Sequence, residues 1–398
     1  MNWAMGELLS APDETYLVDR PIRGIRGGAE EVPEQGIALC MSGGGYRAML
    51  FHTGVLWRLS DEGMLPRLNR VSSVSGGSIT AGVLAMNWGR LAFDAQGVAA
   101  QFARQVVEPL RKMASRQVDV TSVLLGISLP FTSISDRVVK AYRRYLFGKT
   151  TLQDLPEAPR FVINATNLES GVLMRFTRPY LADYRVGRVP NPDLPLAVAV
   201  AASSAFPPFL SPFTVDLTHA AWVTDKGNDL ATPEFRGEIR LSDGGVYDNL
   251  GLETAWKRYS TILVSDAGGR MGANANPPGD WPRHMLRVLQ VADNQVRSLR
   301  KRQVIEAFRA GTRTGMYVSI RSDPARYPVP DPILVDPKVP QQLAAVPTRL
   351  DALADALQER LINWGYAICD AGLRAHVVPG RPAGRLPYPD QRLDQQWP

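Results

Sequence analysis

The sequence predicts an α/β protein with a mostly parallel central sheet flanked by helices. An apolar strand pattern at 36–41 leads into a cluster of glycines at 43–45, and a helical pattern follows at 47–62. The same order then recurs, with a short strand pattern at 70–74 and a second helix from Gly76. Strand, glycine turn and helix repeated in close succession are typical of parallel strands joined by crossover helices.

The two helices are predicted from the spacing of their apolar residues. In the first, these residues recur about one turn apart, at Met49, Leu50, Val55, Leu56 and Leu59. This spacing places them on a single face, which a helix can bury against a sheet. Gly63 follows the pattern and is a common kind of helix stop. The second helix carries its apolar residues at Ile79, Val83 and Leu84.

Further elements are expected along the rest of the chain. Short runs that favour strands lie at 160–166, 172–176, 238–242 and 261–265. The segment 99–147 has mixed helical character and contains an apolar insert, made by Val123, Leu124, Leu125, Ile127, Leu129 and Phe131. Two more helices are predicted at 283–311 and 348–375.

These elements predict one large α/β domain over 35–375. Its core motifs lie at 36–270 and a helical extension follows at 271–375, because neither internal repeats nor a linker composition divides the segment. A polar lead-in at 1–34 precedes the domain. The residues at 376–398 are rich in proline and are expected to form an extended or disordered tail.

Composition restricts the classes of protein that remain. Hydrophobic residues make up 45% and charged residues 21% of the chain, so disorder throughout and a coiled coil are both excluded. The 45 Lys and Arg against 39 Asp and Glu give a formal charge of +6, which favours an anionic surface without identifying it. The basic residues are scattered and no nucleic-acid motif occurs, so no nucleic-acid partner is expected.

The cysteines and the apolar stretches bear on the compartment. Cys40 and Cys369 are far apart and lack metal-ligand spacing, so neither a disulfide framework nor a metal site is expected. The first twenty residues lack a continuous apolar region. The most apolar stretch, 194–210, is interrupted by Pro207 and Pro208. We therefore expect a soluble cytoplasmic protein, with at most peripheral contact at the inner membrane.

Ser75 is the candidate nucleophile. It lies in Ser73-Val74-Ser75-Gly76-Gly77, at a predicted junction between a strand and a helix. A serine on such a sharp turn has its hydroxyl pushed out above the sheet, and its neighbours must be small. The helix that follows directs its positive end toward the hydroxyl. The usual elbow pattern is G-x-S-x-G, and Ser73 takes the place of its first glycine.

The run of Gly43, Gly44 and Gly45 before Arg47 is a candidate anion cradle. Three consecutive glycines let the backbone approach a ligand closely and turn its N–H groups inward. The segment lacks the third glycine of a dinucleotide fingerprint, because position 48 is alanine, and it lacks the Gly-Lys-Ser/Thr ending of a P-loop. A plain tight turn is the alternative.

Asp243 is the candidate base. It ends a predicted strand and precedes two glycines, in Leu241-Ser242-Asp243-Gly244-Gly245. Ligands of an open parallel sheet bind at the carboxyl ends of its strands, where such a turn would lie. The histidines, namely His52, His219, His284 and His376, lack a recognisable triad context. An unperturbed aspartate titrates near pH 3.9 and a histidine near 6.5, so these bases predict different acid limbs.

A glycine loop, an elbow serine and a late Asp-Gly-Gly, in this order, resemble the bacterial patatin-like phospholipases. The resemblance covers about 36–270 and includes two more stretches, Ala202-Ser203-Ser204-Ala205-Phe206-Pro207-Pro208 and the extension of the Asp-Gly-Gly turn to Gly251. Ser42 stands where many members have Asp or Asn. The resemblance implies the three-layer patatin-like fold and catalysis by a Ser75/Asp243 dyad. It also implies an oxyanion site at Gly43, Gly44 and Gly45, with help from Arg47.

The implied activity is that of a lipid acyl hydrolase, of the phospholipase A or lysophospholipase type. Ser75 would form an acyl-enzyme from the carboxylic ester of a phospholipid, without a metal or organic cofactor. One alternative is a regulated membrane-damaging effector or a ligand-sensing scaffold with weak hydrolysis, in which the basic residues 297–302 bind an activating anion. Another is an acyltransferase or protease with the same nucleophile.

Overall fold

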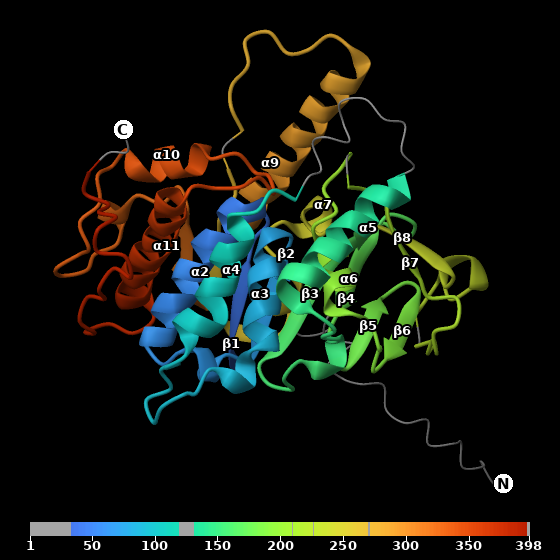
Figure 1. Cartoon of the computed structure of the whole chain (residues 1–398), viewed down its shortest axis with the longest axis horizontal. Coiled ribbons are helices and arrows are strands. Elements are labelled where there is room, and N and C mark those ends of the chain that lie inside the picture. Colours follow the sequence, from blue (N-terminus) through green and yellow to red (C-terminus); the bar gives the residue numbers. More distant parts are fainter. Residues whose placement is uncertain (1–32, 119–130, 209, 226, 270, 396–398) are drawn as a thin grey trace.

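The computed structural model describes residues 33–118, 131–208, 210–225, 227–269 and 271–395 (Figure 1). The predicted lead-in at 1–34 lies outside this description, except for its last two residues. The apolar insert at 123–131 also lies outside it, apart from the backbone of Phe131.

A single ten-stranded sheet organises the chain, in the order β10-β9-β1-β2-β3-β4-β5-β6, with β8 also paired to β3 and β7 to β8. Its strands are β1 Glu34–Met41, β2 Arg70–Val74, β3 Arg160–Asn167, β4 Val172–Phe176, β5 Tyr180–Asp183, β6 Gly187–Pro190, β7 Phe213–Asp216, β8 Glu238–Asp243, β9 Tyr259–Asp266 and β10 Thr314–Ser319. The central strands from β10 to β3 are parallel, as predicted for β9, β1, β2 and β3, whereas β10 was not predicted. The strands beyond β3 are antiparallel and include β5, β6 and β7, which we did not predict.

Helices follow the parallel strands and cover the sheet. They are α2 Gly45–Asp61, α3 Gly76–Met86, α4 Glu108–Ala114, α5 Phe131–Tyr142, α6 Leu196–Ser203, α7 Gly245–Asp248, α8 Glu253–Trp256, α9 Trp281–Arg309, α10 Val339–Ala345 and α11 Asp355–His376. Both predicted strand, glycine turn and helix units are confirmed. The helix expected at 348–375 begins seven residues later than predicted, after an irregular segment.

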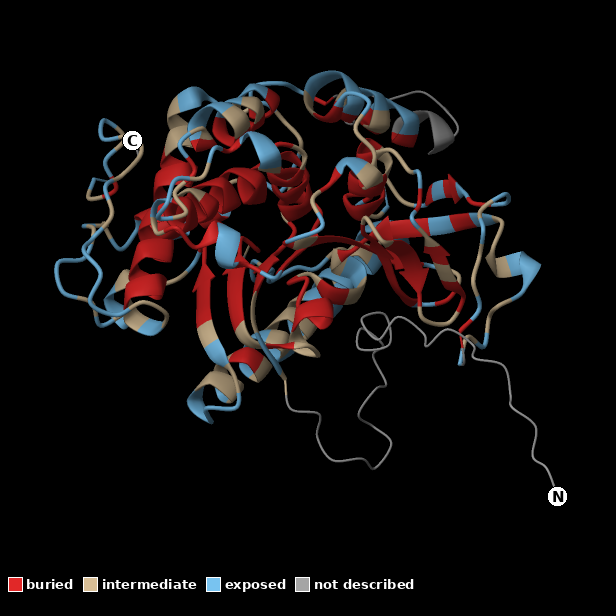
Figure 2. Cartoon of the chain, turned by 90° about the horizontal axis from the view of Figure 1, so that it is seen from below, coloured by how far each residue is buried: buried red, intermediate tan, exposed pale blue. Residues whose placement is uncertain are grey.

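Strand β1 shows why the sheet has helices on both faces. Its side chains alternate, so that Leu39 and Met41 join the larger core beneath α2, α3 and α11. Ala38 and Cys40 join a smaller core on the opposite face, with Val304 of α9. A strand buried on both faces reads as a continuous apolar run, which is the pattern seen at 36–41. Figure 2 shows the buried residues concentrated in the sheet and in the helices next to it.

Helices α2 and α11 cross at a pair of glycines. A methyl group on Gly54 would lie 1.9 Å from the Ile362 carbonyl oxygen, and one on Gly365 would lie 2.0 Å from that of Phe51. The two backbones therefore meet without intervening side chains. This contact fixes the C-terminal helix against the helix that follows the glycine loop.

The proline-rich end of the chain is not a free tail. Residues 377–395 lack helix and strand, but they pack against α2 and α11. The Asn363 amide donates to the Tyr388 and Gln391 carbonyl oxygens, at 2.7 and 2.9 Å. Leu393 is buried in the larger core. Of the two forms that we expected, extended or disordered, these residues take the extended one, and tertiary contacts hold them in place.

We expect Gly365→Ala to lower the free energy of unfolding by about 3 kcal/mol, since the added methyl group meets backbone atoms that cannot rotate away. Denaturant unfolding would measure the loss. Gly89→Ala is the matched control, because nothing lies within 4 Å of a methyl group there. Equal stability of the two variants would contradict the close crossing of α2 and α11.

Candidate active site

Strand β3 brings Ser75 and Asp243 together. Val74, the last residue of β2, pairs with Asn164 of β3 in parallel register. Asp243, the last residue of β8, pairs with the adjacent Ala165 in antiparallel register. The two strands thus meet end to end along one edge of β3. The residues that the sequence placed at two separate strand ends therefore become neighbours.

Ser75 lies on a sharp turn between β2 and α3. Its φ of 51° and ψ of −121° are values that residues other than glycine rarely adopt, and they raise the hydroxyl above the sheet. The neighbours are small because the turn is crowded. A methyl group on Gly76 would lie 2.3 Å from the Gly45 carbonyl oxygen, and one on Gly77 would lie 2.6 Å from that of Met41.

The strained turn is secured by Ser203, at the end of α6. The Ser75 N–H donates to Ser203 Oγ at 3.0 Å, and Ser203 Oγ donates to the Asn164 carbonyl oxygen at 2.6 Å. The carbonyl oxygens of Ser203 and Ala205 accept the N–H groups of Gly244 and Asp243, at 3.1 and 2.9 Å. The segment after α6 therefore holds both candidate catalytic turns from one side.

Sequence reasoning quoted the stretches that contain Ser203 and Asn249 but gave these residues no role. The Asn249 carbonyl oxygen accepts the Gly43 N–H at 3.2 Å. A methyl group on Gly43 would lie 2.6 Å from Asn249 Oδ1, and one on Gly245 would lie 2.8 Å from it. Asn249 thus ties the glycine loop to the turn that carries Asp243. The only signal for it was its place six residues after Asp243 in the same run.

The glycine loop packs directly on Ser75. A methyl group on Gly43 would lie 3.1 Å from the Ser75 Cβ. Because its own N–H is bonded to Asn249, Gly43 offers the site no free donor. Gly44 and Gly45 have φ of 138° and 58°, and no acceptor among the described residues takes their N–H groups. These two groups lie at the start of α2, and α3 begins beside Ser75, so two helix N-termini favour negative charge here.

Arg47, which we expected to help at the oxyanion site, binds backbone carbonyl oxygens and lies beside Gly44, since a methyl group there would be 3.4 Å from its Nη2. Its buried guanidinium donates to the carbonyl oxygens of Ala344 and Val346, at 3.1 and 2.6 Å, and to that of Ala267 at 3.0 Å. Burial, with Arg297 nearby, lowers its pKa to about 10. Arg47 thus braces the glycine loop against the end of β9 and the segment after α10.

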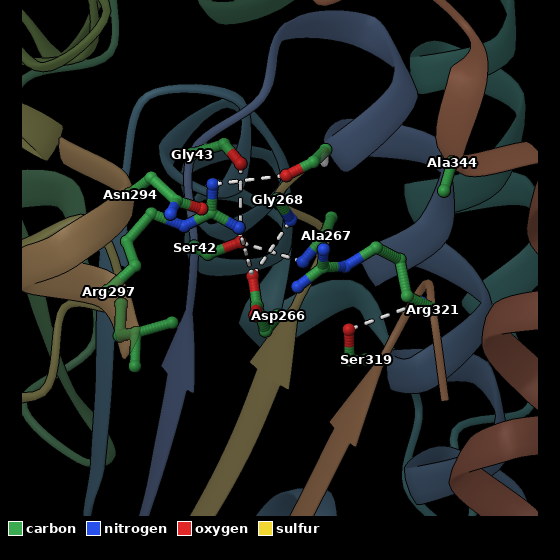
Figure 3. Close-up of polar contacts among 12 residues, drawn as sticks. Ser42, Gly43, Asp266, Ala267, Gly268, Asn294, Arg297, Ser319, Arg321 and Ala344 are labelled. Carbon is green, nitrogen blue, oxygen red and sulfur yellow. Dashed lines mark hydrogen bonds and ion pairs between the residues drawn. The ribbon is translucent and has the colours of Figure 1, made fainter. Parts of the chain in front are cut away.

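The residue before the glycines belongs to the same brace. Ser42 Oγ accepts the Ala267 N–H at 2.8 Å, and Asp266 Oδ1 accepts the Gly268 N–H at 2.8 Å (Figure 3). A serine can accept this bond as an aspartate would, without adding charge. The substitution at position 42 therefore keeps the loop attached to the end of β9.

Asp243 is buried and hydrogen-bonded to the candidate nucleophile. Its carboxylate accepts the Gly245 N–H at 2.7 Å and the Ser75 hydroxyl. Burial raises the pKa of Asp243 to about 7, although both hydrogen bonds oppose this shift, and the nearby Asp293 carboxylate adds to it. Because of this shift, the acid limb is expected near neutral pH rather than near the pKa of an unperturbed aspartate. At neutral pH this carboxyl group can both accept and return a proton.

The histidines take no part in this arrangement. His52 is fully buried in α2, with Nδ1 2.7 Å from Ser265 Oγ and Nε2 2.9 Å from the Ser42 carbonyl oxygen. Burial lowers its pKa to about 4, so the ring is neutral and positions the glycine loop. The other three, His219, His284 and His376, are exposed and lie between β7 and β8, on α9 and at the end of α11.

A hollow of about 410 Å³ lies elsewhere on the surface, lined by Arg143, Gly148, Lys149, Thr151, Asp193 and Pro195. Pro195 begins α6, whereas Ser203, which contacts Ser75, ends it. The hollow is thus at the opposite end of α6 from the candidate nucleophile. The candidate active site is therefore identified by the residue types around Ser75 and not by this hollow.

The described fold and site define an α/β protein with an elbow serine beside a buried aspartate and a glycine loop. The sequence model for patatin-like phospholipases matches residues 39–256, which is more than half of the chain. The chain belongs to the patatin-like phospholipase family. Comparison with curated proteins finds no match.

The solved structures that match the chain include VipD from Legionella pneumophila, at 15% identity and a TM-score of 0.37, and the match covers 86% of this chain and 67% of that one. Human GIVD cytosolic phospholipase A2 is 14% identical, with a TM-score of 0.44, and the match covers 91% of this chain and 65% of that one. The chain thus spans about two thirds of the length of these proteins. Every helix in the described ranges is too short or too polar to cross a membrane.

The raised pKa of Asp243 predicts a dependence of stability on pH. Since the folded state binds this proton more tightly than the unfolded chain, its contribution is fully present below about pH 4 and is lost as the pH rises through about 7. Asp243→Asn removes this pH-dependent contribution to the free energy of unfolding. The variant should therefore gain stability over wild type between pH 4 and 8, by on the order of 3 kcal/mol. Denaturant unfolding across this range measures the difference, and a constant difference would contradict the shift.

Proposed function

We propose that this protein is a lipid acyl hydrolase that cleaves the carboxylic esters of phospholipids by a Ser75/Asp243 dyad. The placing of the strained Ser75 turn and the buried Asp243 at neighbouring positions of β3 is the observation that carries the proposal. Membership of the patatin-like phospholipase family supports the substrate class. VipD and the human phospholipase are too distant to specify an acyl position.

The first half of the reaction would form an acyl-enzyme. Asp243 accepts the proton of the Ser75 hydroxyl as Oγ attacks the ester carbonyl carbon. The carbonyl oxygen becomes an oxyanion, which the Gly44 and Gly45 N–H groups stabilise together with the start of α2. When the carbon–oxygen bond to the leaving group breaks, that group takes the proton from Asp243 and departs as an alcohol.

The second half would regenerate the enzyme. A water molecule passes a proton to Asp243 and attacks the acyl carbon. Collapse of this second intermediate returns the proton to Ser75 Oγ and releases a free fatty acid. The carboxyl group alternates between base and acid, which suits a pKa near neutrality. The proposed steps require neither a metal ion nor an organic cofactor.

Ser75→Ala should abolish hydrolysis of both soluble esters and phospholipids. A fluorophosphonate probe should label the wild type and leave this variant unlabelled. Ser78→Ala is the matched control, because Ser78 lies in the same turn of α3 but its hydroxyl is bonded to Ser73 and Ser203, at 3.0 and 2.9 Å. Labelling of the Ser75→Ala variant at the wild-type level would refute the nucleophile.

The acid limb of the pH profile distinguishes the two possible bases. With Asp243 as base, kcat/KM on a soluble ester should fall about tenfold per pH unit below about 7, as the carboxylate protonates. With His52 as base, activity would persist to about pH 4. His52→Gln should keep substantial turnover and the same limb, while Asp243→Asn should be nearly inactive. An acid limb at pH 4 that His52→Gln abolishes would restore a histidine mechanism.

Incubation with mixed phospholipids, followed by mass detection of products, tests the substrate class. Release of free fatty acids and lysolipids is expected. Transfer of acyl chains to an added alcohol, or cleavage of peptides in preference to lipids, would favour the acyltransferase or protease alternative. In the regulatory alternative, two residues of the proposed anion site are already paired, because Arg297 and Arg300 of α9 face Asp266 and Glu253, at 3.6 and 2.8 Å.

A further inference from the structure

Helix α9 turns its polar side toward the protein body. Arg297 lies 3.6 Å from Asp266 and donates to the Gly269 carbonyl oxygen at 3.2 Å. Arg297 and Asn294 extend from α9 toward the end of β9 (Figure 3). Further along, Lys301 lies over the Tyr317 ring, 4.9 Å from its centre. Val304 is the only fully buried residue of this helix.

The opposite side of α9 is an exposed apolar stripe. It is formed by Trp281, Met285, Val288, Leu289, Ala292 and Leu299, which recur at helical spacing. Trp281 is 75% exposed, and Leu289 is 49% exposed. Helices of globular proteins normally bury such a stripe and expose their polar face. From Trp281 to Leu299 this arrangement is reversed, whereas Val304, Ile305 and Phe308 further along α9 pack against the smaller core.

The stripe lies at the same edge of the sheet as Ser75. Strand β9 is parallel to β1, and β1 to β2, so the end of β9 that contacts α9 and the turn that carries Ser75 share one edge. The helix also packs on α7, directly after the Asp243 turn. Figure 1 shows the N-terminal part of α9 standing out beyond this edge.

Other exposed apolar residues surround the same edge. Phe206 is 59% exposed and follows Ala205, whose carbonyl oxygen accepts the Asp243 N–H. Val246 is 51% exposed and lies three residues after Asp243, on α7. Of the eleven large hydrophobic side chains exposed in the described residues, six are on α9 and these two flank the candidate active site. Most of the exposed large hydrophobic side chains therefore lie on α9 or beside the candidate active site.

We propose that α9 is an interfacial anchor, whose apolar stripe enters the surface of an anionic lipid bilayer and holds the Ser75 edge against it. The binding itself is independent of the proposed hydrolysis. The proposed hydrolysis is needed only for the further statement that a lipid ester in the bound layer faces Ser75. Anchor and active site form one surface, so a bound lipid layer lies next to the candidate nucleophile.

The composition of α9 favours a lipid surface over a protein partner. Amphipathic helices that lie in a membrane interface combine apolar residues that include tryptophan on one side with Arg and Lys on the other. Helix α9 carries seven Arg or Lys against two Asp or Glu. Arg302 is exposed, and Arg283 is exposed but paired with Asp280 at 2.5 Å, so both can meet anionic headgroups while Asp280 partly offsets the charge of Arg283. Trp281 is at the tip, where an aromatic ring suits the headgroup level.

The test uses the full chain with Ser75→Ala, so that the vesicles stay intact. Sedimentation would measure binding to vesicles of phosphatidylcholine alone and with about 30% phosphatidylglycerol, a composition that gives a negative surface. The anionic vesicles should bind more tightly. Adding Trp281→Ser, Met285→Ser and Leu289→Ser together should weaken this binding at least about tenfold. Adding Arg283→Gln should weaken it about fivefold, and only on the anionic vesicles.

Leu168→Ser is the matched control, because Leu168 is 47% exposed, much like Leu289, but lies between β3 and β4. It should leave vesicle binding unchanged. With Ser75 restored, the triple variant should turn over a soluble ester at the parent rate, since the stripe does not contact Ser75. Loss of vesicle binding with soluble turnover intact supports the anchor. Absent turnover in every chain, with the binding differences preserved, would reject only the hydrolase.

Three results would overturn the anchor. The first is vesicle binding that the triple substitution leaves unchanged. The second is a triple variant whose melting temperature falls by several degrees, which would mean that another part of the chain covers the stripe. The third is a parent that light scattering shows to be a dimer and a triple variant that is a monomer with parental vesicle binding. In that case the stripe would join two copies of the chain.

Discussion

The pairing of two strands with consecutive positions of β3 is the constraint on which the site depends. Val74 is held opposite Asn164 and Asp243 opposite Ala165, so the separation of the candidate nucleophile and candidate base is set by backbone hydrogen bonds rather than by flexible side chains. Ser203 reinforces this arrangement because it binds the turns at both strand ends. The sheet thus provides the preorganisation that acyl transfer requires.

The buried carboxyl group of Asp243 shows a conflict between stability and activity. Burial makes ionisation of this carboxyl group unfavourable. At the pH where the group must be ionised to act as a base, the folded state is therefore less stable. The strained backbone of Ser75 is a second cost of the same kind. The larger core, which extends from β1 to Leu393, supplies the stability that tolerates both. Local rules of good folding are broken where the chemistry is proposed to occur.

Much of the fold and the candidate site could be predicted from local sequence. The parallel strands were recognisable because both of their faces are apolar, and Ser75, Asp243 and the glycines were recognisable because tight turns restrict residue type. The features that could not be predicted depend on contacts between residues far apart in the sequence. The bonds of Arg47 to carbonyl oxygens could not be predicted, because these partners lie about three hundred residues away. The pKa of Asp243 depends on burial, and the packing of the C-terminal residues depends on α11. Strands β5 and β6 are only four residues long and give a weak pattern.

The brace around the glycine loop has a consequence for biosynthesis. The Tyr46 N–H donates to the Arg349 carbonyl oxygen, and Arg47 binds the carbonyl oxygens of Ala344 and Val346. These partners are synthesised after Ser75 and Asp243. A nascent chain therefore carries both candidate catalytic residues while its glycine loop still lacks this support. The loop proposed to stabilise the oxyanion is thus secured later in synthesis than the proposed dyad.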